Sequence, residues 1–163
     1  MQNPDRVCYQ AKAVIHFHRG EERIMPKEQQ PKPLPAVDDL THPFWEAAAR
    51  HQLVIQRCQE CTYFNHPPRA VCDACQSQQL AYVPVSGRGR IYSYAVMHQP
   101  NIAGFEQDIP YLNLLVELVE QPRLLMVSYL PISAKATVQI GAAVEVYFEP
   151  INAEITLPQF RLV

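Results

Sequence analysis

The residues of this chain that most clearly suggest a chemical role are four cysteines between positions 58 and 75. They form two C-x2-C pairs separated by ten residues, Cys58 with Cys61 and Cys72 with Cys75. A C-x2-C turn points both sulfurs into one small space, and two such turns facing each other across a short hairpin complete a four-sulfur tetrahedron for zinc. The spacing therefore predicts one closed metal site, which supports structure rather than catalysis because protein ligands take every position.

The same thiols have alternative interpretations. They could form a pair of disulfides or a redox-active C-x-x-C, or they could bind iron in place of zinc. Reduced cytosolic thiols argue against disulfides, and the βαβ surroundings of a redox motif are missing. Thr62 and Gln76 follow the second cysteine of each pair, where many ribbons have glycine because positive φ is easiest there. We therefore expect these two residues to distort the turns or to weaken the metal site.

The residues before the cysteines predict a short helix. Thr41 is a candidate N-cap, and Pro43 falls in the first turn, where a missing N–H costs little. The apolar residues Phe44, Ala47 and Ala48 are spaced so that they share one helical face. A helix of about two turns is not stable alone. It either packs on its own domain or inserts into the groove of a partner.

Strand patterns dominate the rest of the chain. Residues 53–57 read as a strand that leads into the first cysteine pair. From about residue 80, short runs rich in Val, Ile, Tyr and Phe alternate with Pro and Gly turn signals. Five or so strands in that length predict a small closed or nearly closed OB-like barrel. The expected fold is mainly β, with a helix and a zinc ribbon over residues 38–79 and the barrel over 80–163.

The first 37 residues predict a disordered arm, because they are rich in Pro, Lys, Glu and Gln. Their start has no apolar segment of the kind found in secretory signals, and Met25 is a candidate for the true start. No apolar run approaches the roughly 20 residues that cross a bilayer. We therefore expect a cytoplasmic protein with no membrane partner. The formal net charge of −2 argues against a nucleic-acid partner.

The order of these features resembles the zinc-ribbon/OB-fold family of acyl-CoA-associated accessory proteins, long catalogued as a domain of unknown function. The resemblance covers residues 42 to 161 and implies a rubredoxin-like zinc ribbon followed by a five-stranded OB fold. Besides the four cysteines, the motifs that carry it are HPFW (42–45), HPPR (66–69), SGRGRIYSY (86–94), GFEQDIPY (104–111), LLVEL (114–118) and TLPQFR (156–161).

This resemblance implies a non-catalytic accessory subunit. Members of the family pair with thiolase-like enzymes, lipid-transfer-protein-like aldolases or hot-dog-fold hydratases that act on CoA thioesters. The chain would bind or position acyl-CoA in a hetero-oligomer while its partner does the chemistry. By the same resemblance, the four cysteines would hold one structural Zn²⁺. Two further groups would contact the ligand or the partner, a protruding helical element with Pro43, Phe44 and Trp45, and a loop with Gly104, Phe105, Pro110 and Tyr111.

Three arginines are candidate phosphate contacts, because guanidinium groups pair well with phosphate oxygens. They are Arg69, between the cysteine pairs, and Arg88 and Arg90, which flank a glycine. The alternative is that each is a solvated surface arginine.

No catalytic residue is predicted, since no nucleophile or carboxylate pair accompanies His51, His66 or His98 in the sequence. A second function class is a single-stranded nucleic-acid binder that uses the same barrel. Such barrels combine stacking aromatics with a basic groove. The aromatics are present here, but from position 80 onward there are five basic and seven acidic residues. Charge therefore favours the accessory subunit.

Overall fold

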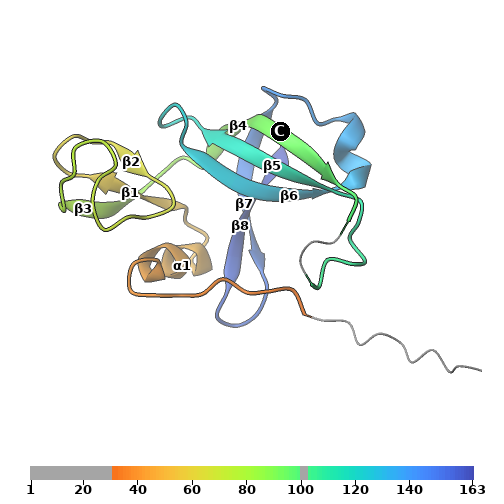
Figure 1. Cartoon of the computed structure of the whole chain (residues 1–163), viewed down its shortest axis with the longest axis horizontal. Coiled ribbons are helices and arrows are strands. Elements are labelled where there is room, and N and C mark those ends of the chain that lie inside the picture. The colour runs from red at the N-terminus through yellow and green to blue at the C-terminus, as the bar shows by residue number, and fades with distance from the viewer. Residues whose placement is uncertain (1–30, 100–102) are drawn as a thin grey trace, which may run out of the picture.

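The computed structural model describes residues 31–99 and 103–163, which form two antiparallel β-sheets and one short α-helix (Figure 1). The smaller sheet has the strand order β2-β1-β3, and its strands are β1 (Val54–Cys58), β2 (Phe64–Asn65) and β3 (Leu80–Pro84). The larger sheet has the order β6-β5-β4-β7-β8. Its strands are β4 (Arg88–Met97), β5 (Tyr111–Leu118), β6 (Leu125–Pro131), β7 (Ala143–Pro150) and β8 (Thr156–Leu162). The predicted mainly β fold, with a ribbon followed by an OB-like sheet, is confirmed.

Helix α1 (His42–Ala49) begins where the sequence predicts, with Thr41 at the N-cap position and proline in the first turn. The Thr41 side chain makes no capping bond. Its hydroxyl accepts from the Asp38 N–H over 3.0 Å and donates to the Asp38 carboxylate over 2.7 Å. The predicted apolar face is buried and packs against strands β1, β7 and β8 of the same chain.

One hydrophobic core serves both sheets. Leu53 and Ile55, from the ribbon side, pack in the same cluster as Ile91 and Leu112 of the larger sheet. Phe160 of β8 belongs to the same cluster and is fully buried. Because the ribbon has few apolar residues of its own, this shared core is what holds it against the larger sheet.

The larger sheet is not a closed barrel, in contrast to the closed or nearly closed barrel that the strand count predicted. Strands β6 and β8 are its two edges, and no backbone ladder joins them in the part of the chain that the structure describes. One physical reason is Pro158 in β8, which has no N–H for a ladder.

Strand β3 pairs with β1, so residues 80–84 lie in the ribbon sheet although the sequence grouped them with the barrel. The predicted domain boundary after residue 79 stays a prediction. Of the expected disordered arm, residues 1–30 lie outside the described residues. Residues 31–37 have no helix or strand, and the Lys32 ammonium forms an ion pair with Asp108. Nowhere in the described chain does a helix reach the length and apolarity that a membrane crossing requires.

Candidate metal centre and ligand pocket

The four cysteine sulfurs lie within 4.8 Å of one another. Two of the separations, Cys58 to Cys75 and Cys61 to Cys72, are 3.6 Å. Sulfurs around a tetrahedral zinc with bonds of about 2.3 Å would be roughly 3.8 Å apart, whereas a disulfide requires about 2.05 Å. All four thiols are free. The disulfide interpretation is therefore wrong for these residues, and the four cysteines are positioned to bind a metal ion.

The two turns that carry these cysteines are well formed without glycine. Thr62 and Gln76 adopt φ values of 65° and 62°. Their backbone N–H groups donate to the carbonyls of Cys58 and Cys72 over 3.0 and 2.9 Å, respectively. The distortion that we expected is thus absent from the sulfur geometry. It appears instead as a left-handed backbone, which costs roughly 1–2 kcal/mol for a non-glycine residue.

The thiols differ in their readiness to ionise. The backbone N–H of Cys61 lowers the pKa of Cys58 to about 6. The N–H of Ser77 acts in the same direction on Cys75, but hydrogen bonds with the other thiols, chiefly Cys61, and burial raise the pKa of Cys75 to about 12. Sulfurs so close together repel as thiolates unless a cation lies between them. This donor set fits a divalent metal ion.

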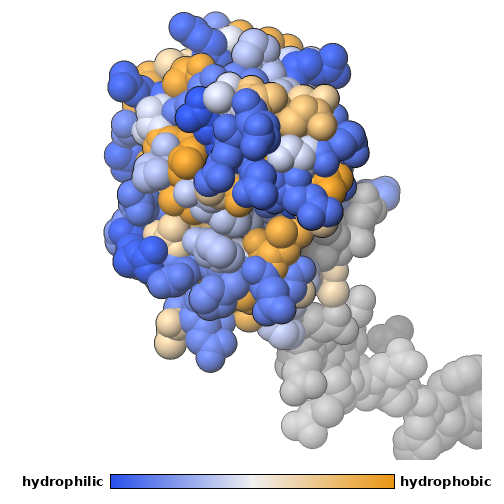
Figure 2. Space-filling view, turned by 90° about the vertical axis from the view of Figure 1, so that its left-hand side faces the viewer, coloured by the Kyte–Doolittle hydropathy of each residue, from blue (hydrophilic) through white to orange (hydrophobic). Residues whose placement is uncertain are grey.

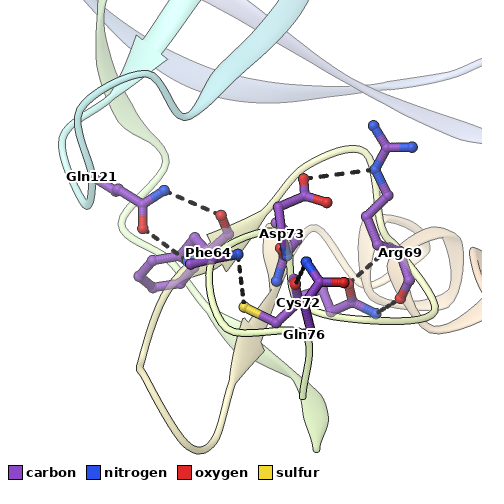
Figure 3. Close-up of polar contacts among 9 residues, drawn as sticks. Phe64, Arg69, Cys72, Asp73, Gln76 and Gln121 are labelled. Carbon is purple, nitrogen blue, oxygen red and sulfur yellow. Dashed lines mark hydrogen bonds and ion pairs between the residues drawn. The ribbon is translucent and has the colours of Figure 1, made fainter. Parts of the chain in front are cut away.

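Gln121, in the turn between β5 and β6, fastens the ribbon to the larger sheet (Figure 3). Its side-chain oxygen accepts from the Phe64 N–H over 2.8 Å, and its side-chain nitrogen donates to the Phe64 carbonyl over 3.1 Å. The side-chain amide thus pairs with β2 as a neighbouring strand would.

Two more amide side chains organise the ribbon around the metal turns. Gln56 exchanges two hydrogen bonds of 2.9 Å with the backbone of Arg69. Asn65 accepts from the backbone N–H of Asp73, next to Cys72, over 3.0 Å. Sequence analysis missed all three amides. The one available signal was Gln56, a polar residue inside an otherwise apolar run.

An apolar pocket of about 510 Å³ lies where helix α1, the loop after β2, and strands β6 and β8 meet. This volume is within the range of small-molecule sites. Its walls are largely aromatic and aliphatic, and they include Phe44, Trp45, His66, Phe105, Tyr111 and Tyr129.

Two polar groups stand out in the pocket walls. Burial lowers the pKa of His66 to about 4, so its imidazole is neutral near pH 7. The ring centre of His66 lies 5.9 Å from that of Phe44. The indole Nε1 of Trp45 is buried and has no hydrogen-bond partner among the described residues. Sequence analysis named Trp45 as a ligand or partner contact, but it gave His66 no such position, because most residues that surround His66 in the pocket are distant in the chain.

Four of the predicted contact residues converge on this pocket: Phe44, Trp45, Phe105 and Tyr111. The other members of the two predicted groups, Pro43, Gly104 and Pro110, lie next to them in sequence but do not line it. The helical element does not protrude, since Phe44 is part of the core. The ligand or partner contacts themselves stay predictions.

The three arginines lie elsewhere. Arg69 is exposed, with its side chain 3.8 Å from the Asp73 carboxylate (Figure 3). Arg88 and Arg90 line a separate cavity of about 200 Å³ at the start of β4, and Arg90 donates to the Gly141 carbonyl over 3.1 Å. Gly89, between them, is required by packing, because a Cβ there would lie 2.7 Å from the Glu117 carbonyl oxygen. A phosphate role for these arginines stays a prediction.

The surface at the ribbon end of the molecule is mainly hydrophilic, with scattered apolar patches (Figure 2). The ribbon therefore does not present one continuous apolar surface on that face. Its apolar contacts are directed inward, to the shared core.

Both parts of the chain match family models of known proteins. Residues 45–81 match the family described as the ChsH2 rubredoxin-like zinc ribbon domain, and residues 82–149 match the ChsH2 C-terminal OB-fold domain. A chain of a solved structure, the Ltp2-ChsH2(DUF35) aldolase, is 37% identical with a TM-score of 0.68. The match covers 79% of this chain and 98% of that one.

Two curated relatives carry functional names. A probable enoyl-CoA hydratase alpha subunit from Thermomonospora curvata is 41% identical over an alignment of 138 residues that covers 82% of this chain and 42% of the relative. A DUF35 domain-containing scaffold protein from Methanothermobacter thermautotrophicus is 31% identical over an alignment of 106 residues that covers 64% of this chain and 77% of the relative. The chain thus spans less than half the length of the hydratase subunit.

Proposed function

This chain belongs to the ChsH2 (DUF35) family of zinc-ribbon and OB-fold proteins, and on that basis we propose that it is a scaffold subunit of a complex acting on CoA thioesters. It binds or positions the acyl-CoA and docks an enzyme that does the chemistry. The partner is a hydratase, an aldolase or a thiolase-like enzyme. The names of the relatives, a hydratase subunit, an aldolase complex and a scaffold protein, support this choice.

The observation that carries the proposal is the pocket between the ribbon and the larger sheet. It is large enough for part of a CoA thioester and mostly apolar, and Trp45 in its wall carries a buried indole N–H without a partner among the described residues. The described residues that line it include no carboxylate, thiol or amine. The pKa of its imidazole, at about 4, is too low for proton transfer near neutrality. These features favour binding over catalysis.

The metal in this proposal is one zinc ion held by Cys58, Cys61, Cys72 and Cys75. An all-sulfur tetrahedral donor set favours zinc, and the matching family is described as a zinc ribbon. A closed site of this kind supplies structure. Asn65 links the second metal turn to β2, and β2 leads directly into His66 in the pocket wall.

A calorimetric titration tests the binding function. The purified chain is titrated with CoA, with acetyl-CoA and with a short single-stranded oligonucleotide at two salt concentrations. We expect saturable binding of the CoA compounds and none of the oligonucleotide. Salt-sensitive oligonucleotide binding without CoA binding would contradict the proposal and favour the nucleic-acid binder.

Affinity purification of the tagged chain from its native cells tests the scaffold role. We expect a hydratase, aldolase or thiolase-like enzyme to co-purify in a fixed ratio. Turnover of a CoA thioester by the isolated chain would contradict the non-catalytic assignment.

A further inference from the structure

The two edge strands of the larger sheet, β6 and β8, face each other across a seam that the backbone does not close. Within the described chain, each hydrogen bond across this seam uses a side-chain oxygen. The Ser128 hydroxyl donates to Gln159 Oε1 and accepts from the Phe160 N–H, both over 2.9 Å. The Tyr129 N–H donates to the same Gln159 oxygen over 3.2 Å. The edges are thus joined at one point, and the pocket opens beside it.

Pro158 explains why the edges do not pair where the pocket lies. Alternate residues of a strand point their N–H groups to the same side. Because the Phe160 N–H reaches across the seam to Ser128, position 158 faces the seam as well. Proline has no N–H to donate there, and Pro158 is buried in the pocket wall. The seam therefore stays open at this position.

The open seam leaves backbone polar groups facing an otherwise apolar pocket. The Tyr129 N–H points across the seam, so by the same alternation the N–H and C=O of Val127 point there too. Val127 lines the pocket, and so does Trp45. The Trp45 Nε1 has no partner in the described chain and is shielded from solvent, so a ligand reaches it only when the side chains that cover it move. A ligand with amide groups would satisfy both donors.

We propose that the seam is a slot for an extended chain that carries amides, and that its occupant is the pantetheine arm of the CoA thioester. This inference rests on the proposed function. The backbone of Val127 pairs with one amide of the arm as a neighbouring strand would, while the Trp45 indole donates to a carbonyl oxygen. Pro158 positions the slot by preventing β6 and β8 from closing on each other.

The size of the pocket favours this arm over a peptide strand from a partner protein. At roughly 30 Å³ per water-sized group, 510 Å³ holds about 17 such groups, close to the roughly 18 non-hydrogen atoms of pantetheine. A strand of four residues is larger. The Lys32 ammonium lies 4.8 Å from the ring centre of Phe105 and 5.7 Å from that of Tyr129, two residues of the pocket wall.

Competition against acetyl-CoA on the full-length, zinc-loaded protein tests the occupant. The competitors are pantetheine, 3′,5′-ADP, and an oligo-ether thiol of equal length without amides. We expect pantetheine to compete and to shift the NMR signals of the Val127 amide and the Trp45 indole. The ether thiol should bind at least tenfold more weakly, and 3′,5′-ADP should leave these two signals unchanged. Equal competition by the ether thiol would overturn the inference, as would signals that respond to the nucleotide alone.

Variants of the protein test the positioning role. Pro158→Val supplies an N–H and a strand-forming residue, so the edges should pair and pantetheine affinity should fall at least tenfold with no loss of melting temperature. The matched control, Pro150→Ala, changes an exposed proline at the end of β7 and should bind as the wild type does. Trp45→Phe keeps an aromatic ring but removes the N–H, and should weaken binding about fivefold.

If Pro158→Val does not fold, Trp45→Phe and the ether thiol decide the question. Wild-type affinity for pantetheine in every test variant that folds would overturn the inference. CoA binding that shifts signals elsewhere contradicts the slot but leaves the proposed function intact. Absence of CoA binding by the zinc-loaded chain, alone and with its co-purified enzyme, contradicts the proposed function itself.

Discussion

At the scale of single residues, the metal site depends on two positions where a residue with a side chain adopts an unfavourable backbone conformation. Thr62 and Gln76 hold the left-handed conformation that glycine adopts most easily. Thr62 makes no side-chain hydrogen bond among the described residues, whereas the Gln76 amide donates to the Cys72 carbonyl over 3.2 Å. The two turns therefore have the same backbone geometry, but only the Gln76 turn has a side-chain hydrogen bond that offsets the strain.

Thr62→Gly should raise the free energy of unfolding by about 0.5–1 kcal/mol, because it removes the clash of a β-branched residue at positive φ. Gln76→Gly should have nearly no net effect, since it also removes a hydrogen bond worth about 1 kcal/mol. Urea denaturation at one fixed zinc concentration measures both. Destabilisation by Thr62→Gly would show that the turn is not strained.

His66 should make the fold sensitive to acid. Its pKa is about 4 in the folded chain and about 6.5 when unfolded. Above pH 6.5 the imidazole is neutral in both states and contributes nothing. As the pH falls from 6.5 to 4, only the unfolded state gains the proton, so stability decreases by about 3 kcal/mol. His66→Gln should make the stability profile flatter in this window, and an unchanged slope would contradict the burial of the imidazole.

At the scale of elements, the two-residue strand β2 makes contacts with several parts of the molecule despite its short length. It pairs with β1 on one side, receives the Gln121 side chain, and leads into the pocket wall. Asn65 within it also contacts the backbone beside the second metal turn. This strand therefore connects the metal turns, the larger sheet and the pocket.

Gln121→Ala should destabilise the protein by about 1–3 kcal/mol, because it leaves the N–H and C=O of Phe64 without their partners. Hydrogen exchange of the Phe64 amide should accelerate in step with this loss. As a control, Gln139→Ala removes an exposed amide and should change stability by less than about 0.5 kcal/mol. If the two variants were equally stable, the side-chain pairing with β2 would not hold the ribbon.

At the scale of the whole molecule, features that depend on local sequence patterns could be predicted, whereas features that depend on long-range contacts could not. The cysteine turns and the buried face of α1 depend on spacings of two to four residues, so their positions could be predicted. The pairing of Gln121 with Phe64 joins residues 57 positions apart, and no local pattern records it. The pocket is similar, because Trp45, Tyr129 and the seam meet only through the fold. A strand count could likewise not show that Pro158 leaves the sheet open.

Removing the metal should unfold the ribbon first and weaken ligand binding as a consequence. The ribbon is too small for a core of its own, so metal binding supplies much of its folding free energy. With a strong chelator we expect a lower melting temperature, loss of dispersed NMR signals from residues 54–84, and at least tenfold weaker CoA binding. A chelated sample with full thermal stability would contradict the structural role of the four thiols.

We propose that a zinc-organised ribbon and an OB-like sheet together form a binding site for CoA thioesters. The most direct measurement is an equilibrium titration of acetyl-CoA into the purified chain, with the metal content determined on the same sample. We expect one zinc per chain and saturable binding of one acetyl-CoA. A folded protein without metal, or a zinc-loaded protein that shows no saturable binding, would contradict it.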